Sequence, residues 1–250
     1  MTSALIIATV TVVAYSLWVR RHTWWSRWEA SISLAIALEG CALLLMSPFA
    51  SAVLGPPLHR VLGLWNVQQL LGHLCFVIAV AANIHHVMLR LTDQARVRPM
   101  FRRQVVVPAA LGASLLVAVF VIADADFHAD LFSHDGSNTW LAIYWVVFGA
   151  LLTYLSGYAG RVVMIARADP RAKETADLYL LSTIFGLALC AVVASTALIN
   201  IDVSVVAWLC ACLAVGTFAY AAARSWQAKT AWFEPGNRSP RPSTPPRPAT

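Results

Sequence analysis

Charged residues are scarce in this chain: Asp, Glu, Lys and Arg together make up 12% of its 250 residues. Soluble domains average about 25% charged residues, whereas 59% of this chain is hydrophobic. So little charge cannot cover the surface of a soluble protein, which excludes a single water-soluble domain. The hydrophobic residues fall in blocks close to the ~20 residues that a helix needs to span a bilayer. The composition predicts an all-α integral membrane protein.

Residues that hold cofactors are also few. The two lysines, Lys173 and Lys229, lie outside the hydrophobic blocks, which excludes a retinal protein because its Schiff base needs a lysine within a span. Every histidine inside a hydrophobic block belongs to the same block, whereas a b-type haem needs histidines that face each other from two helices. Small buried side chains rather than disulfides or metal ligands are expected at the five cysteines, which all lie inside the blocks. They are Cys41, Cys75, Cys190, Cys210 and Cys212. No cofactor is predicted.

Catalytic motifs are missing as well. The chain has no Gly-rich phosphate loop, dinucleotide fingerprint or zinc-protease helix. Tyr154-Leu155-Ser156-Gly157 is close to the Gly-x-Ser-Gly of intramembrane serine proteases, but its first glycine is absent and no histidine base follows in the next hydrophobic block. These absences favour a protein that is not an enzyme.

Hydropathy predicts seven spans within a transmembrane domain of residues 1–226. Their ranges are 4–19, 30–54, 67–90, 105–123, 140–165, 178–199 and 203–223. The first block has no basic residue before it and no small-residue cleavage site, so it is expected to remain as an anchor. Prolines at Pro48 and Pro56-Pro57 are expected to stop the second helix in the following loop.

Basic residues give the predicted orientation. All but one of the 18 Lys and Arg residues lie in alternate connections or after the last span, and the exception is Arg60. Basic connections are held in the cytoplasm, which predicts an external N-terminus and a cytoplasmic C-terminus in the plasma membrane. Residues 227–250 are rich in proline and are predicted to form a disordered cytoplasmic tail.

Polar residues inside a span are costly and often functional. Glu39 is the acidic residue at the middle of a predicted span, and Asn83 and His73 lie on the neighbouring span. One interpretation is a proton or substrate site built from Glu39 with Asn83 or His73. The other is a protonated Glu39 whose interhelical hydrogen bond orients two helices. His85 and His86, near the cytoplasmic end of that span, are expected to be solvated or lipid-facing.

The external connection between the fourth and fifth predicted spans carries alternating carboxylates and imidazoles. Such a pattern could bind a divalent cation, although an acidic outer face and Asp-Gly turn chemistry explain it equally simply. The weak metal candidates are Asp124, Asp126, His128, Asp130 and His134.

Several of these features together resemble a known family. They are the run Leu70-Leu71-Gly72-His73-Leu74, the basic loop 96–103, Val119-Phe120 before Asp124-Ala-Asp126-Phe127, and Tyr144. The chain is similar, over about residues 20–200, to a large, uncharacterised actinobacterial family of seven-span membrane proteins. Its members are often labelled transporters or hypothetical integral membrane proteins. Longer members carry a cytoplasmic domain after the last span, where this chain has its proline-rich tail.

Two functions remain open from the sequence. The first is a non-enzymatic multi-pass protein that acts by interaction at the cell envelope, as a sensor, a regulator or a phage exclusion factor. The second is a small proton-coupled transporter that uses Glu39. The expected partners are the lipid bilayer, a cytoplasmic protein bound through the proline-rich tail and a second copy of the chain. Nucleic acid is not expected, because the basic residues form no continuous patch.

Overall fold

The computed structural model describes residues 2–26, 28–123, 126–130, 132, 138–196 and 203–233. Every regular element among these residues is helical. The α-helices are α1 Thr2–Val19, α2 Ala30–Met46, α3 Pro48–Leu62, α4 Val67–Leu91, α5 Gln94–Phe101, α6 Val107–Ala123, α7 Thr139–Ala166, α8 Lys173–Thr196 and α9 Ser204–Phe233. A 3-10 turn, η1, covers Thr23–Trp25, and a π-helical stretch, η2, covers Arg102–Val106.

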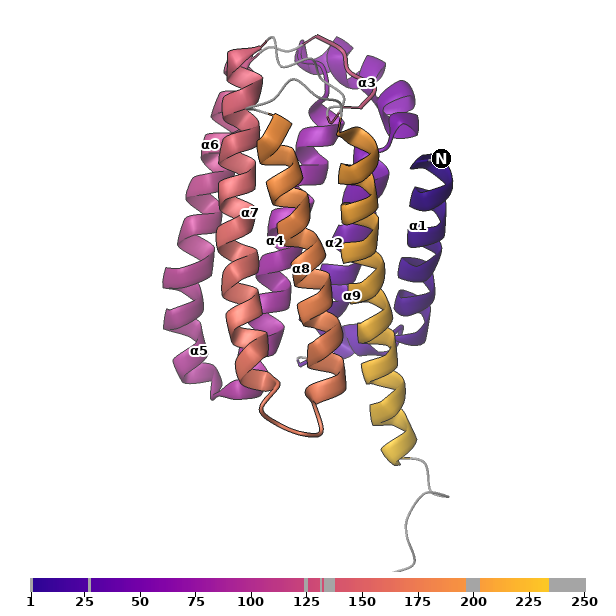
Figure 1. The fold of residues 1–250 in the computed structure, drawn as a ribbon, viewed down its shortest axis with the longest axis vertical. Helices are drawn as coiled ribbons and strands as arrows, with labels where there is room; N and C mark the ends of the chain where they lie inside the picture. Colours follow the sequence, from indigo (N-terminus) through magenta and orange to yellow (C-terminus); the bar gives the residue numbers. More distant parts are fainter. Residues whose placement is uncertain are drawn as a thin grey trace, which may run out of the picture.

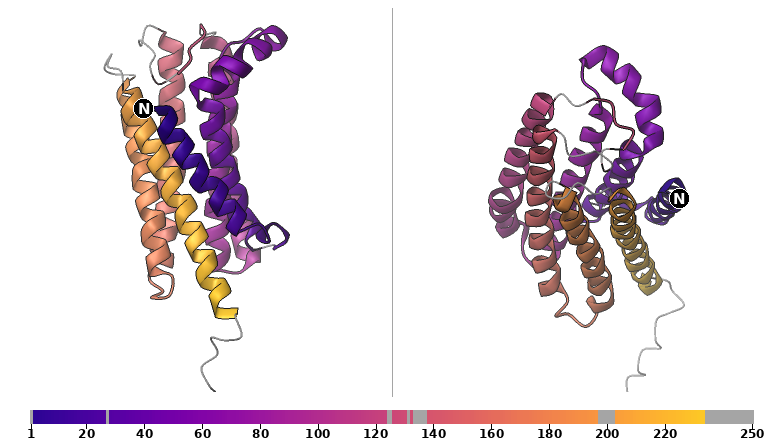
Figure 2. Two further views of the ribbon diagram at one scale, coloured as in Figure 1. Left: turned by 90° about the vertical axis from the view of Figure 1, so that its right-hand side faces the viewer. Right: turned by 45° about the horizontal axis from the view of Figure 1, so that its top comes forward.

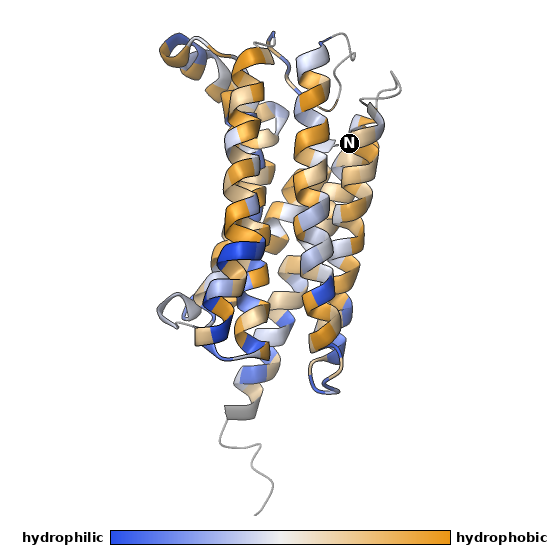
Figure 3. Ribbon diagram, turned by 90° about the vertical axis from the view of Figure 1, so that its left-hand side faces the viewer, coloured by the Kyte–Doolittle hydropathy of each residue, from blue (hydrophilic) through white to orange (hydrophobic). Residues whose placement is uncertain are grey.

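The long helices run side by side along one axis and form a single bundle (Figure 1). Helix α1 begins at the same end of the bundle as α3, and α9 ends at the opposite end (Figures 1 and 2). We call these two ends the α3 end and the basic end. The basic end holds residues 20–26, 28 and 29, α5, the α7–α8 connection and the last turns of α9. Hydrophilic residues gather mostly toward the ends of the helices, and the middle is largely hydrophobic (Figure 3).

The predicted fold class is confirmed. Among the described residues, six helices are long and apolar enough to cross a membrane, and the bent pair α2–α3 makes seven if it counts as one span. Large apolar side chains on the outside of the bundle, such as Leu111 (69% exposed) and Ile184 (60% exposed), face outward along the helices. A surface of this kind suits lipid rather than water. The chain is therefore a multi-pass helical membrane protein.

The predicted second span, 30–54, is not one straight helix. Helix α2 ends at Met46, and α3 departs from it at an angle of 76°. Ser47 caps α3 by accepting a hydrogen bond from the Ala50 N–H at 3.2 Å. Pro48 then occupies the first turn, where a missing N–H costs nothing. The stop predicted at Pro56-Pro57 is wrong, because both prolines lie inside α3, which ends at Gly63 with a positive φ of 71°.

Helix α3 turns outward from the α3 end of the bundle (Figure 2). It leaves apolar side chains uncovered, among them Phe49 (76% exposed) and Val61 (81% exposed). A helix that turns aside from the bundle and keeps an apolar exposed surface is suited to the interface between water and lipid.

Two further boundaries differ from the prediction. The fourth span begins earlier, because α5, η2 and α6 form one run from Gln94 to Ala123 where a loop was expected before residue 105. The last helix continues to Phe233, beyond the predicted start of the tail at residue 227. Half of residues 224–233 are strong helix formers and none is proline, and Lys229 is bonded to the rest of the bundle. The remainder of the predicted tail, 234–250, lies outside the described residues.

Small residues bring the central helices close together. At Gly72 of α4, an added Cβ would lie 2.6 Å from Met46 Cγ and 3.1 Å from the carbonyl oxygen of Ala42 on α2. Alanines on α9, such as Ala219 and Ala222, are fully buried. In lipid, close backbone approach replaces the hydrophobic effect as the source of helix association. This close packing fixes the side chains that form the site below.

Candidate binding site at the basic end

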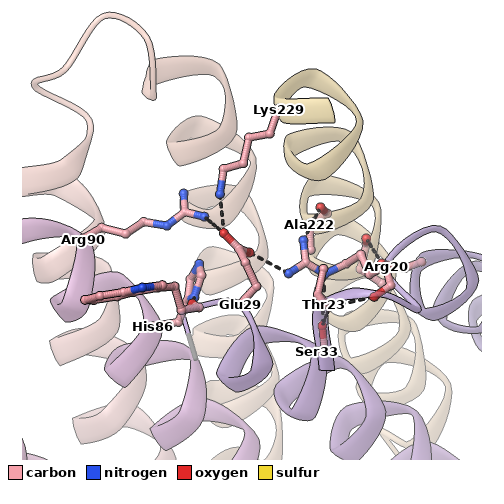
Figure 4. Close-up of polar contacts among 11 residues, drawn as sticks. Arg20, Thr23, Glu29, Ser33, His86, Arg90, Ala222 and Lys229 are labelled. Atoms are coloured by element: carbon pink, nitrogen blue, oxygen red, sulfur yellow. Dashed lines mark hydrogen bonds and ion pairs between the residues drawn. The ribbon is translucent and has the colours of Figure 1, made fainter. Parts of the chain in front are cut away.

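Glu29 is the centre of a charged network at the basic end. It precedes α2, and its carboxylate accepts hydrogen bonds from Arg20 Nη2 at 2.8 Å, from Arg90 Nη2 at 3.1 Å and from Lys229 Nζ (Figure 4). The three cations come from the end of α1, from α4 and from α9. A single carboxylate thus joins helices that are far apart in the sequence.

Arg20 is the most deeply buried member of this network, with 1% of its surface exposed. Besides Glu29, it donates to Ser33 Oγ at 3.3 Å and to the Ala222 carbonyl oxygen at 3.1 Å (Figure 4). Thr23 supports the turn by donating to the Arg20 carbonyl at 2.7 Å. A buried cation with this many partners is held in one position.

The network is positive overall, because three cations share one carboxylate. Burial would raise the pKa of Glu29, but hydrogen bonds from Lys229 and Arg20 and the charge of Arg90 outweigh burial and lower that pKa to about 2. Glu29 is therefore ionised throughout the physiological range. Arg90 and Lys229 each use a single donor on Glu29, so further N–H groups on both remain for another acceptor.

A cavity of about 510 Å³ lies beside this network, between α4, α7, α8 and α9. Arg90 and Lys229 line both the cavity and the network. The other polar lining residues are His86, Asp169, Arg171, Thr175, Tyr179 and Ser225, and the apolar ones are Val87, Leu91, Val163, Ala166, Ala172, Ala176 and Ala228. This volume falls within the ~300–1,000 Å³ of small-molecule sites. We call this cavity the basic pocket.

His86 corrects one prediction. It was expected to be solvated or lipid-facing, yet it is 1% exposed and lines the basic pocket. Its Nδ1 lies 3.0 Å from the Trp28 carbonyl oxygen, which can only accept, so Nδ1 carries the hydrogen. Its Nε2 has no hydrogen-bond partner among the described residues. In the neutral ring, Nε2 is an unused acceptor. The neighbouring His85 is half-buried, and its Nδ1 lies 3.1 Å from Ser31 Oγ.

The intramembrane candidates do not form one site by hydrogen bonding. Glu39 is 8% exposed, and its Oε2 has no partner among the described residues. Asn83 Oδ1 likewise has no hydrogen-bond partner among the described residues. His73 is fully buried and pairs with Tyr144 instead, with 2.6 Å between Nδ1 and the hydroxyl. Its ring also packs against Phe148, with 4.3 Å between ring centroids.

Only part of the candidate metal loop lies among the described residues. Asp124 and His134 lie outside the described residues, and the described part of the chain contains no group of three His, Cys, Asp or Glu side chains placed to hold a metal. Asp130 accepts from Trp208 Nε1 at 2.8 Å. Asn66 donates to the Asp126 carbonyl at 2.8 Å and accepts from the His128 N–H at 3.0 Å. The described contacts of this loop fix its course over the bundle.

Sequence reasoning missed Glu29 and Arg20 because both lie in a connection that looked like an ordinary basic loop. A signal was present, since Glu29 is the acidic residue in the Arg-rich segment 20–29 and directly precedes a span. Its three partners lie 9, 61 and 200 residues away in the sequence. Only the folded bundle brings them together.

The fold and the apolar outer surface place the chain among multi-pass helical membrane proteins. No family model, no curated protein and no solved structure matches it. The resemblance to the actinobacterial seven-span family stays a prediction.

Proposed function

We propose that this protein is a sensor or regulator in the plasma membrane that acts by binding a ligand in the basic pocket, rather than by catalysis. Its basic end faces the cytoplasm, as basic connections of membrane proteins do. The observation that supports the proposal is the sharing of Arg90 and Lys229 between the pocket and the Glu29 network. A ligand that takes hydrogen bonds from these two side chains competes with Glu29.

This competition gives the binding event a route to the rest of the bundle. Glu29 connects the end of α1, the start of α2, α4 and α9. A ligand shifts a conformational equilibrium only by as much as it interacts differently with the two states. Here the difference is the set of bonds that Lys229 and Arg90 make with Glu29. Helix α9 leads to the C-terminal segment, so a change at Lys229 reaches the part of the chain that would contact a cytoplasmic partner.

The experiment fills the pocket without changing a charge. Ala172→Phe adds a ring at a half-buried position of the pocket wall, and Leu111→Phe makes a change of lipid-facing bulk on α6, where Leu111 is 69% exposed. Wild type and both variants are expressed at equal membrane abundance in a host that lacks the protein, and host transcripts and phage plating efficiency are measured. Wild type and Leu111→Phe should give the same response, and Ala172→Phe should give none. A full response from Ala172→Phe, or no response to wild type, overturns the proposal.

Glu39 supports a second candidate function, a proton-coupled transporter. The structural interpretation of Glu39 predicted an interhelical hydrogen bond, and the described residues contain no hydrogen bond from its Oε2. A buried carboxyl with no partner to hold its proton is a candidate proton carrier. In proteoliposomes that contain a pH-sensitive dye, wild type should then dissipate an imposed pH gradient. Glu39→Gln should abolish this flux, whereas Glu174→Gln, at an acidic residue in a pair with 71% of its side chain exposed, should keep it. Equal flux through Glu39→Gln and wild type removes Glu39 from the mechanism.

A further inference from the structure

The basic pocket lies where the apolar helices end. Around it, α4 ends at Leu91 and α7 ends at Ala166, both on its lining, and α8 begins at Lys173. This is the level at which the hydrocarbon core of a bilayer gives way to lipid headgroups. The pocket lining is likewise part apolar and part charged, because it consists of alanine, valine and leucine side chains together with arginine and lysine. A ligand that fits such a lining has a charged part and an apolar part.

The charge of the pocket favours an anion. Arg90, Arg171 and Lys229 line it, and Arg20 lies behind them in the Glu29 network. Two carboxylates oppose these four cations. Glu29 is already shared by three of them, and Asp169 accepts a hydrogen bond from the Arg171 backbone N–H at 3.0 Å. The Arg171 guanidinium makes no ion pair with any described residue. An excess of cations with unused donors is the pattern that binds phosphate.

His86 closes the wall of the pocket beside these cations. It is 1% exposed and lines the pocket, and its Nε2 is buried without a partner among the described residues. Because so little of the ring is accessible, a ligand in the pocket meets the arginine and lysine donors rather than Nε2.

We propose that the basic pocket binds an anionic phospholipid, whose phosphate is held by Arg90, Arg171 and Lys229. This inference rests on the proposed function and names its ligand class. The lipid reaches the pocket from the leaflet at the basic end, and its phosphate competes with Glu29 for Arg90 and Lys229.

The test measures lipid binding to the purified full chain in detergent by native mass spectrometry. Two lipids with identical acyl chains test the requirement for charge: phosphatidylglycerol has a net negative charge, and phosphatidylcholine has none. Phosphatidylglycerol should bind at least about tenfold more tightly than phosphatidylcholine, because charge-assisted bonds are stronger. Equal binding of phosphatidylglycerol and phosphatidylcholine overturns the proposal.

Arg171→Gln tests the position of the site. Arg171 does not contact Glu29, so this change leaves the network that holds the helices together. The matched control is Arg96→Gln, at an exposed arginine of α5 at the same end of the bundle and outside the pocket. Arg171→Gln should weaken phosphatidylglycerol binding about tenfold, and Arg96→Gln should leave it unchanged. Equal binding by the two variants shows general attraction to a basic surface and overturns the site.

Soluble glycerophosphoglycerol separates a lipid from a free phosphate ester. It has the same phosphodiester and headgroup as phosphatidylglycerol without acyl chains, and it should compete with phosphatidylglycerol only weakly. Competition at equal concentration would show that the pocket takes a soluble ligand, and the proposal of a lipid ligand would be wrong.

The proposed function can fail independently of the lipid site. If Ala172→Phe keeps the host response while Arg171→Gln loses lipid binding, the lipid site stands and the sensor does not. If no lipid binds and Ala172→Phe still abolishes the response, the sensor stands and the lipid site does not.

Discussion

Glu29→Gln is the sharpest test of the charged network, because glutamine keeps the size of the side chain and removes its charge. Arg20, with 1% of its surface exposed, would then lie buried without a counter-ion. Breaking a buried ion pair by removing one partner costs about 3–5 kcal/mol. The pKa gives a second value. Glu29 shifts from 4.5 to about 2, and at 1.36 kcal/mol per unit this is roughly 3 kcal/mol. The two routes agree.

The pKa also fixes the pH range in which this stabilisation disappears. Because the pKa of Glu29 is lower in the folded protein than in the unfolded chain, the contribution is complete above about pH 4.5. It is lost as the pH falls toward about 2. The free energy of unfolding of wild type should therefore decrease over this range relative to that of Glu29→Gln. At neutral pH the variant should already be less stable by about 3 kcal/mol.

The assay is reversible unfolding of the purified chain in detergent, followed by far-ultraviolet circular dichroism at several pH values. Glu174→Gln is the matched control. It removes the partner of Arg224 from an ion pair whose side chains are 71% and 49% exposed, and such pairs contribute about 0–1 kcal/mol. If Glu29→Gln costs no more than Glu174→Gln, or if wild type and Glu29→Gln change in parallel between pH 4.5 and 2, the buried network does not stabilise the bundle.

Two further predictions concern topology and packing. A reporter fused at residue 230 should be cytoplasmic and one inserted near Gly136 external, as measured by compartment-specific labelling, and the opposite pattern would refute the orientation. Gly72→Ala should cost about 1–3 kcal/mol of stability in the same unfolding assay, because the new Cβ would meet Met46 and the Ala42 carbonyl. Gly157→Ala is its control, since a Cβ there meets nothing within 4 Å. Equal stability of the two variants would show that α2 and α4 can separate without cost.

The membrane character and the helical class follow from local sequence alone. A run of apolar residues must satisfy its own backbone hydrogen bonds in lipid, and a helix does so within one segment. The predicted ranges 67–90 and 140–165 therefore match α4 and α7 closely. Ranges at the bilayer boundary were predicted less well. Near Pro48 and after residue 226, hydropathy no longer decides whether the chain is helical, and capping by Ser47 or a tertiary bond from Lys229 does.

The candidate site shows more clearly what sequence and tertiary structure each decide. The sequence drew attention to Glu39, Asn83 and His73 because a polar residue in an apolar run is visible without a structure. It gave no comparable signal for Glu29, which lies among arginines in a connection. Whether a carboxylate there is solvated or buried depends on which helices cover it.

The sequence by itself determined that this protein is a bundle of membrane-spanning helices with its cations concentrated in alternate connections. Its apolar runs are local, and local hydropathy is enough to establish them. Only the tertiary structure decided that α4 and α9 bring Arg90 and Lys229 to Glu29, and that His86 faces a pocket instead of lipid. The physical reason is that burial and ion pairing are properties of several helices together. Residues 200 positions apart become partners only when close helix packing places them within hydrogen-bonding distance.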